Sequence, residues 1–330
     1  MYTAHLIAYS QQDREPTMQQ IEFRAMGCAM HAAIDSDEPE ALVWLEEAPR
    51  WMADWEQHLS RFRPQSELSV LNSNPGRWTP VSTVLWAVLQ AAIEAARTTG
   101  GLVTPAILNA VEASGYTRDF AAGAWAEESQ PTNARPAPRA GDLSDALERI
   151  GFDERRRMVR LPADVRLDLG GIAKGWAADE IARRLGAVAP TLIDAGGDIA
   201  VSGPMADGSP WPVAIPNPLR PDEQLDLLML TTGGVATSGR DYRRWRQGEG
   251  YAHHIIDPRT GVSAQTDILT ATVVGPSVAV AEAGAKAVLI TGSTTWHDTL
   301  NRWPDTTGLI VLEDATVLRA PTWTEHCWQS

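Results

Sequence analysis

Residues 165–181 read VRLDLGGIAKGWAADEI, a short apolar run followed by two glycines and then by a helical pattern. A strand that passes through Gly170 and Gly171 into a helix brings backbone N–H groups close to any bound group, and the helix dipole adds partial positive charge. Lys174 adds a full charge. The spacing matches neither the P-loop nor the dinucleotide fingerprint. The segment therefore predicts either an anion site suited to phosphate or a tight packing turn.

Lysine is scarce in this chain, which makes Lys174 informative. Of 28 basic residues only Lys174 and Lys286 are lysines, and all the others are arginines. Lysine carries a compact point charge that arginine does not reproduce. The bias favours a specific task for each lysine, with chance as the alternative.

Composition excludes several classes of protein. The 330 residues are 44% hydrophobic, which is enough for one large domain or two modest ones. The net charge of −14 argues against nucleic acid or an anionic membrane surface as a general partner. Two cysteines, Cys28 and Cys327, are too few for a disulfide framework. With no signal-peptide pattern at the start and no spanning stretch, we expect a cytoplasmic protein without membrane insertion.

The hydrophobic pattern places short strands between long helices, joined by links of hairpin length, which favours an α+β fold with a mainly antiparallel sheet flanked by helices. The expected helices cover residues 38–60, 81–98, 172–186 and 277–291, with a polar turn over 61–72. The expected strands cover 21–35 with a bend at Gly27, a hairpin over 158–169, then 191–194, 198–202, 211–215, 225–231, 253–256, 269–274, 308–312 and 315–319. Residues 1–20 read as a polar leader, 120–142 as a surface insertion or linker, and 321–330 as a C-terminal tail.

A second glycine pair repeats the theme in LIDAGGDIA, residues 192–200. Gly196 and Gly197 permit positive φ and a close approach of a ligand. The flanking Asp194 and Asp198 could accept hydrogen bonds from a sugar or a ring N–H. A plain hairpin turn is the alternative.

Two later segments hold candidate polar groups. TTGGVATSGRDYRRW, residues 231–245, contributes Ser238 and several arginines, which form either a cationic cluster or a solvated turn. YAHHIIDPRTG, residues 251–261, contributes His253 and His254. A histidine titrates near neutrality and could accept a proton from an attacking hydroxyl, although a structural histidine would fit the same pattern.

Taken together, these motifs resemble the ApbE-type FAD:protein FMN transferases. The matching segments are AMGCAMH near the N-terminus, SRFRPQSELSVLN (60–72), DLGGIAKGWAAD (168–179), DAGGDI (194–199), VATSGRDYRRW (235–245), HHIIDPRTG (253–261) and TATVVGPSVAVAEAGAKAVLITG (270–292). The resemblance covers residues 20 to 320 and implies a single ApbE-like, T-fold-like domain over 21–320.

The resemblance also implies a reaction. Such transferases bind FAD and Mg²⁺, cleave the pyrophosphate and attach FMN by a phosphoester to Ser or Thr of a target flavoprotein, with release of AMP. Lys174 would stabilise the pyrophosphate and His254 would be the base for the incoming hydroxyl. The residues implied to bind FAD are Met26, Arg63, Asp168, Gly170, Gly171, Lys174, Gly196, Gly197, Asp198, Ser238, His254 and Ile255.

The implied metal site departs from the family pattern, which is the carbonyl of the residue here Ala173 together with A-D-A-x-x-T on a late helix. Glu282 replaces the Asp and Lys286 replaces the Thr. An ammonium cannot ligate Mg²⁺ and repels it. Glu282 and Lys286 are four residues apart on a helix and can pair, so the ammonium could take the position of the metal. Alternatively, Lys286 bends away and Mg²⁺ binds Glu282, Ala173 and the FAD phosphate. Thr104 likewise replaces an Asp that many relatives carry.

Two other functions stay open. The chain could be a non-catalytic FAD-binding protein with a degenerate metal site. It could also be an FAD pyrophosphatase, in which water takes the place of the target hydroxyl.

Overall fold

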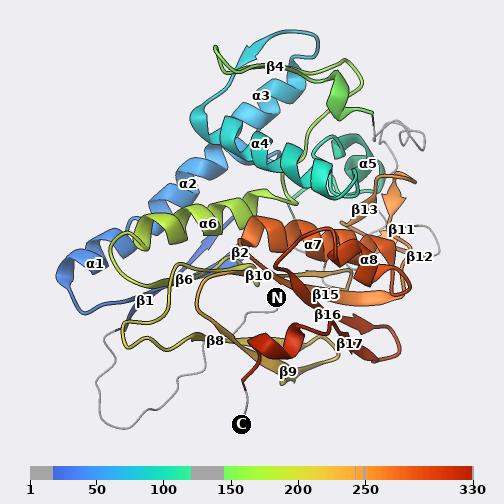
Figure 1. Ribbon diagram of the computed structural model, residues 1–330. Coiled ribbons are helices and arrows are strands. Elements are labelled where there is room, and N and C mark those ends of the chain that lie inside the picture. Colours follow the sequence, from blue (N-terminus) through green and yellow to red (C-terminus); the bar gives the residue numbers. More distant parts are fainter. Residues whose placement is uncertain (1–17, 120–144, 242, 248–249, 329–330) are drawn as a thin grey trace.

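The computed structural model describes residues 18–119, 145–241, 243–247 and 250–328, and its centre is an eight-stranded sheet (Figure 1). Neighbouring strands pair antiparallel throughout, in the order β1-β2-β6-β7-β10-β15-β16-β17. The strands are β1 (Met18–Ala25), β2 (Cys28–Asp35), β6 (Thr191–Asp194), β7 (Ile199–Val201), β10 (Gly233–Gly239), β15 (Ile268–Gly275), β16 (Thr307–Leu312) and β17 (Val317–Arg319). The expected α+β class with a mainly antiparallel sheet is confirmed.

The long helices cover one face of this sheet (Figure 1). Those next to the sheet are α1 (Pro39–Leu45), α2 (Ala48–Leu59), α6 (Ala173–Leu185) and α7 (Val278–Thr291), and α4 (Thr83–Thr98) packs on the outer side of α2, α6 and α7. Their apolar sides share one buried cluster with the sheet, which includes Met52, Leu89, Ile181, Ile193 and Val288. Around this layer lie α3 (Glu67–Ser73), α5 (Leu108–Ala113), α8 (Trp296–Leu300), the 3₁₀ turn η2 (Leu147–Arg149) and a small sheet of β3 (Thr79–Pro80), β4 (Gly151–Asp153) and β5 (Met158–Arg160).

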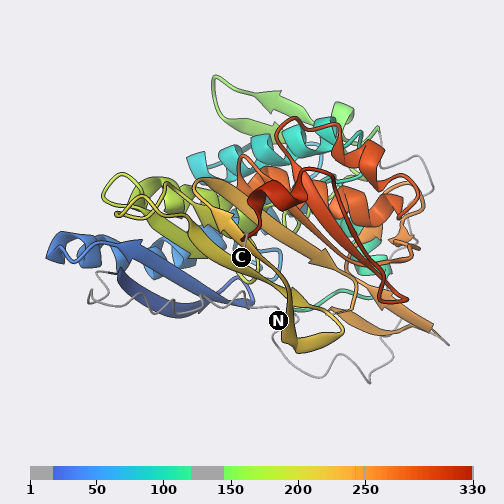
Figure 2. The ribbon, with the colours of Figure 1, turned by 60° about the horizontal axis from the view of Figure 1, so that its bottom comes forward.

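A long hairpin covers the opposite face. It consists of β8 (Trp211–Asn217) and β9 (Arg220–Leu230), and the 3₁₀ turn η3 (Trp323–His326) packs beside it. Figure 2 shows β1 and β2 at one edge of the sheet, with β16 and β17 at the other. Two further small pairs, β11 (Arg244–Gln247) with β12 (Gly250–His253) and β13 (Ile256–Asp257) with β14 (Val262–Ser263), lie near α5 and α7 (Figure 1).

Three local expectations differ from the structure. The helical pattern over 38–60 forms two helices, because Pro49 lies in the first turn of α2, where its missing N–H costs least. The expected polar turn over 61–72 contains α3, whose N-cap Ser66 accepts from the N–H of Ser69. The prediction of a hairpin over 158–169 is wrong. Only Met158–Arg160, which is β5, forms a strand, and it pairs with β3 and β4.

The backbone of residues 167–168, in the second half of that expected hairpin, forms hydrogen bonds with residues far away in the sequence. The N–H of Leu167 donates to Oδ1 of Asn72 at 2.7 Å, and Nδ2 of Asn72 donates to the carbonyl of Leu167 at 2.8 Å. The N–H of Asp168 donates to the carbonyl of Pro105. Buried backbone groups need such partners, and here they come from α3 and a loop instead of a neighbouring strand.

The expected chain boundaries fall partly outside the described part of the chain. Residues 1–17 of the expected leader and the whole insertion over 120–142 lie outside it. Of the expected tail over 321–330, the described part packs against the hairpin: Trp323 is fully buried, and the N–H of Trp328 donates to the carbonyl of Leu227. Over the described ranges, no helix combines the length and apolar character needed to cross a membrane.

Asp179 of α6 fixes the beginning of α7. Its carboxylate accepts from the N–H groups of Val278 and Ala279, both at 2.9 Å. We expect Asp179→Ala to lower the free energy of unfolding by about 1–3 kcal/mol, because two helix-terminal N–H groups lose their acceptor. Urea denaturation measures this loss. Asp179→Asn keeps one oxygen acceptor and should lose less, whereas an Ala variant as stable as the wild type would contradict the assignment.

Candidate active site

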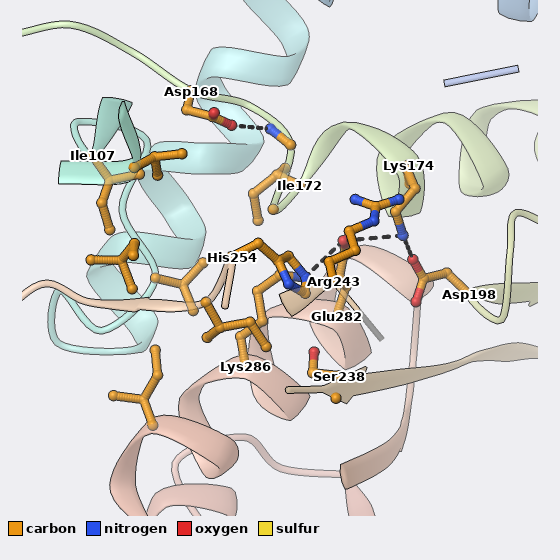
Figure 3. A pocket seen from close by; sticks show the side chains of 18 of the residues that line it. Ile107, Asp168, Ile172, Lys174, Asp198, Ser238, Arg243, His254, Glu282 and Lys286 are labelled. Atoms are coloured by element: carbon orange, nitrogen blue, oxygen red, sulfur yellow. Dashed lines mark hydrogen bonds and ion pairs between the residues drawn. The ribbon is translucent and has the colours of Figure 1, made fainter. Parts of the chain in front are cut away.

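Two neighbouring cavities meet at the beginning of α6. The first is lined by both glycine turns, by β10 and by residues of α7, and Figure 3 shows its polar side chains. The second lies between Met26, Phe62 and Tyr116. Residues common to both linings are Asp168, Gly170, Lys174 and Arg243. One long ligand could therefore extend from one cavity into the other past the glycine turn.

The turn before α6 is held by Asp168. One of its oxygens accepts from the N–H of Gly170 at 2.6 Å, and the other pairs with Nε of Arg61 at 2.7 Å. The guanidinium of Arg61 lies over two neighbouring rings, 4.1 Å from the centroid of Phe62 and 4.7 Å from that of Tyr116. This stacking and pairing fix Asp168 and orient the glycine turn.

Lys174 lies in the first turn of α6 and contacts Asp198 directly (Figure 3). Its Nζ is also 3.7 Å from Oε1 of Glu282. Burial opposes the charge, but the carboxylates of Asp198 and Glu282 outweigh it and raise the pKa of Lys174. The ammonium therefore stays charged at neutral pH, beside backbone N–H groups at a helix N-terminus.

The turn between β6 and β7 requires glycine. Gly196 and Gly197 have φ of +71° and +96°, and a Cβ on Gly196 would lie 2.9 Å from Cβ of Cys28. The N–H of Gly197 donates to Oδ1 of Asp194 at 2.6 Å. Burial raises the pKa of Asp194 to about 7. Asp198 therefore lines the cavity, whereas Asp194 stabilises the turn itself.

Helices α6 and α7 cross closely at Gly175. A Cβ there would lie 2.7 Å from Oε2 of Glu282 and 3.3 Å from Cα of Ala279. The N–H of Gly175 donates to Oε2 at 3.1 Å, and Nζ of Lys286 lies 2.8 Å from Oε1. Burial would raise the pKa of Glu282, but the ammonium groups of Lys286 and Lys174 outweigh it and lower that pKa. The pairing expected from the spacing of Glu282 and Lys286 is confirmed.

The two adjacent histidines have different environments. His253 is buried, and its Nε2 lies 3.0 Å from the carbonyl of Ala264, so its ring supports the β13–β14 turn. His254 lines the first cavity, and its Nδ1 is buried without a hydrogen-bond partner in the described part of the chain. Burial, reinforced by the positive charge of Arg243, holds the pKa of His254 well below its usual range. Its imidazole is therefore neutral and able to accept a proton.

The remaining expected residues are distributed around these cavities. Ser238 and Ile255 line the first cavity, as does Thr104, while Met26 and Ala173 line the second. Arg63 lies outside both linings; it pairs with Glu56 at 2.8 Å and is 42% exposed.

Arg61 and Tyr116, which hold the glycine turn through Asp168, are among the residues that the expected site did not include. Arg61 occupies the second cavity two positions before Arg63 in the same motif. Tyr116 belongs to none of the motifs. The segment that holds Arg61 and Arg63 is a turn, so no regular periodicity could have indicated which of the two arginines reaches the cavity.

Comparison with known proteins gives concordant matches. A family model described as the ApbE family matches residues 26–310. The FAD:protein FMN transferase of Treponema pallidum is 31% identical over 322 residues, which cover 88% of this chain and 84% of that protein. The one from Haemophilus influenzae is 28% identical over 258 residues, covering 75% of this chain and 72% of its own length.

Solved structures share the fold. The ApbE protein from Thermotoga maritima has a TM-score of 0.81 at 25% identity, covering 94% of this chain and 100% of that one. The flavin transferase ApbE from Vibrio cholerae has a TM-score of 0.73 at 22% identity, covering 94% and 99%. The architecture that positions the two cavities is thus common to these proteins.

The close crossing of α6 and α7 is testable through Gly175. We expect Gly175→Ala to lower the free energy of unfolding by about 1–3 kcal/mol, because the added methyl group must displace Glu282 or the backbone of α7. Gly203→Ala is the matched control, since a Cβ at Gly203 meets no atom within 4 Å. Chemical denaturation of both variants measures the effect, and equal stabilities would contradict the tight crossing.

Proposed function

The chain belongs to the ApbE family, and from this premise we propose that it is an FAD:protein FMN transferase. The observation that supports this most directly is the pair of cavities that join at a cationic glycine turn. FAD has two ring systems connected by a diphosphate. Such a ligand needs two cavities with positive charge between them, and Lys174 and Arg243 line both cavities here.

The reaction exchanges one phosphorus–oxygen bond for another. A hydroxyl of Ser or Thr on the target flavoprotein attacks the phosphorus atom of the FMN half. The bond from that phosphorus to the bridging oxygen breaks, and the electron pair leaves with AMP. The hydroxyl proton passes to a base, and the product is FMN joined to the target by a phosphoester. The protein contributes positioning, charge and the base.

His254 is the base that the geometry favours. It lines the cavity, its imidazole is neutral, and Nδ1 has no competing partner among the described residues. A base must be unprotonated and within reach of the proton that it takes. Burial also lowers the pKa of His253, but its ring lies against the carbonyl of Ala264 and lines neither cavity, so it fails the second need.

Lys174 is placed to stabilise charge on the diphosphate. An ammonium has three donors, and contact with Asp198 leaves others available to the cavity. Fixed donors of this kind stabilise developing negative charge without reorganising during the reaction.

The residues do not fit the Mg²⁺ site that the family resemblance implies. The described residues contain no group of three or more His, Cys, Asp or Glu side chains arranged to hold a metal ion. Of the two side-chain positions on α7, Glu282 is bound by ammonium groups and Lys286 is itself an ammonium. Mg²⁺ requires several hard oxygen donors in near-octahedral geometry, and a neighbouring cation opposes its binding.

One incubation separates transfer from its alternatives. Purified protein is mixed with FAD and a candidate target flavoprotein, and in-gel flavin fluorescence and AMP release are measured. Transfer gives a labelled target together with AMP. A pyrophosphatase gives AMP without label, and a binding protein gives neither while still quenching FAD fluorescence. Either of the last two results would overturn the proposed reaction.

We expect His254→Ala to slow FMN transfer by about 10²- to 10⁴-fold, the usual contribution of a general base. The FAD dissociation constant should change by less than about threefold, because a base for the acceptor hydroxyl contributes little to FAD binding. Single-turnover labelling and fluorescence quenching measure the two quantities. A variant that loses FAD affinity in proportion to its rate would show that His254 binds FAD instead of activating the hydroxyl.

The pH profile provides an independent test. Because the pKa of His254 lies well below the usual histidine value, transfer should stay fast down to about pH 6.5 and fall only at lower pH. Arg243→Gln removes a positive charge that depresses this pKa, so the acid limb should move to higher pH. Arg244→Gln, on the exposed neighbouring residue, removes the same charge and should leave the limb in place. An acid limb that Arg243→Gln does not move would exclude His254 as the titrating group.

A further inference from the structure

The only two lysines of the chain converge on one carboxylate. Nζ of Lys286 lies 2.8 Å from Oε1 of Glu282, and Nζ of Lys174 lies 3.7 Å from the same oxygen (Figure 3). Both lysines line the first cavity, together with Glu282 and Asp198. All the remaining basic residues are arginines, so two compact ammonium groups occur at this one place.

Both carboxylate oxygens of Glu282 already have partners within the protein. Oε1 contacts the two ammonium groups, Oε2 accepts from the N–H of Gly175 at 3.1 Å, and the side chain is only 1% exposed. A cation entering here would have to displace a lysine from a buried carboxylate. Breaking such a pair is costly, because it leaves an uncompensated buried charge.

The absence of a side chain at Gly171 determines where the side chain of Lys286 can run. A Cβ on Gly171 would lie 3.3 Å from Cε of Lys286, so the side chain runs directly over the glycine turn. Its ammonium therefore ends beside the N-terminus of α6, where Lys174 begins. An ammonium has three donors, and the bond to Glu282 leaves others facing the cavity. Two ammonium groups therefore lie beside the first turn of α6, where the helix dipole adds partial positive charge.

We propose that Lys286 replaces a metal ion in this enzyme, so that Lys174 and Lys286 together bind the diphosphate of FAD and FMN transfer does not require Mg²⁺. This inference rests on the proposed function. Two carboxylates, Asp198 and Glu282, hold the ammonium groups in place and offset their charge. The net positive charge comes from Arg243, which lines both cavities and for which no ion pair is found across the described ranges.

The test titrates MgCl₂ into EDTA-dialysed protein and measures FAD binding by fluorescence quenching, then FMN transfer and AMP release. Wild-type FAD affinity should differ by less than about twofold between EDTA and excess MgCl₂. Lys286→Thr should bind FAD roughly tenfold or more weakly in EDTA, because a charge that pairs with the diphosphate is lost. MgCl₂ should then restore binding, since the threonine hydroxyl adds an oxygen donor beside Glu282.

Two further variants separate charge replacement from damage to the fold. Lys286→Met removes the charge without adding an oxygen donor, so MgCl₂ should not restore its FAD binding. Arg183→Thr removes one positive charge from the exposed face of α6 and should bind FAD like the wild type. Thermal unfolding confirms that each variant is folded.

The outcomes distinguish the two proposals. A wild type that binds FAD and transfers FMN, but loses either activity in EDTA, overturns the metal-free inference alone. A wild type that binds FAD equally in EDTA and MgCl₂ but labels no target supports Lys286 in metal-free diphosphate binding and overturns the transfer reaction. Absence of any FAD binding overturns both. A Lys286→Thr variant whose affinity stays at the wild-type value in EDTA also overturns the role of Lys286.

Discussion

The site depends on one buried carboxylate. Glu282 lies where α6 and α7 cross, accepts a hydrogen bond from the N–H of Gly175, and binds the ammonium groups of Lys174 and Lys286. A carboxylate at this depth would be strongly destabilising without these partners. Each partner is therefore fixed by the others: the glycine permits the crossing, the crossing buries the carboxylate, and the carboxylate holds both lysines at the beginning of α6.

The same constraint explains why glycine recurs in these motifs. Gly175 admits the carboxylate of Glu282, Gly171 leaves room for the stem of Lys286, and Gly196 fits against Cys28. From the sequence, an anion site and a packing turn were alternative interpretations of such glycines. In the structure they are compatible, because close packing is what brings the ammonium groups to the cavity.

The sequence predicted the features that depend on neighbouring residues. The helix that follows the glycine pair at Lys174, the pairing of Glu282 with Lys286, and the helix capped by Ser277 all follow from local spacing. The errors and omissions involve partners distant in the chain. The expected hairpin over 158–169 failed because Asn72, 95 residues earlier, binds the backbone of Leu167. Arg61 pairs with Asp168 while its guanidinium lies over the rings of Phe62 and Tyr116. No pattern in the sequence near Arg61 distinguishes it from Arg63.

An ammonium group on a side chain and a bound metal ion can both stabilise the negative charge of a diphosphate, but they differ in charge and in how they are positioned. Mg²⁺ brings two charges and strict geometry, but it must be captured from solution with part of its water shell. Lys286 brings one charge, and folding alone positions it, since Glu282 and Gly171 determine its path. The missing charge must come from elsewhere if the diphosphate is to be stabilised equally. Arg243 is the residue placed to supply it, because it lines both cavities of an otherwise acidic protein. Burial, and after it the charge of Arg243, lowers the pKa of His254, so one arginine both completes the anion site and helps to keep the base neutral.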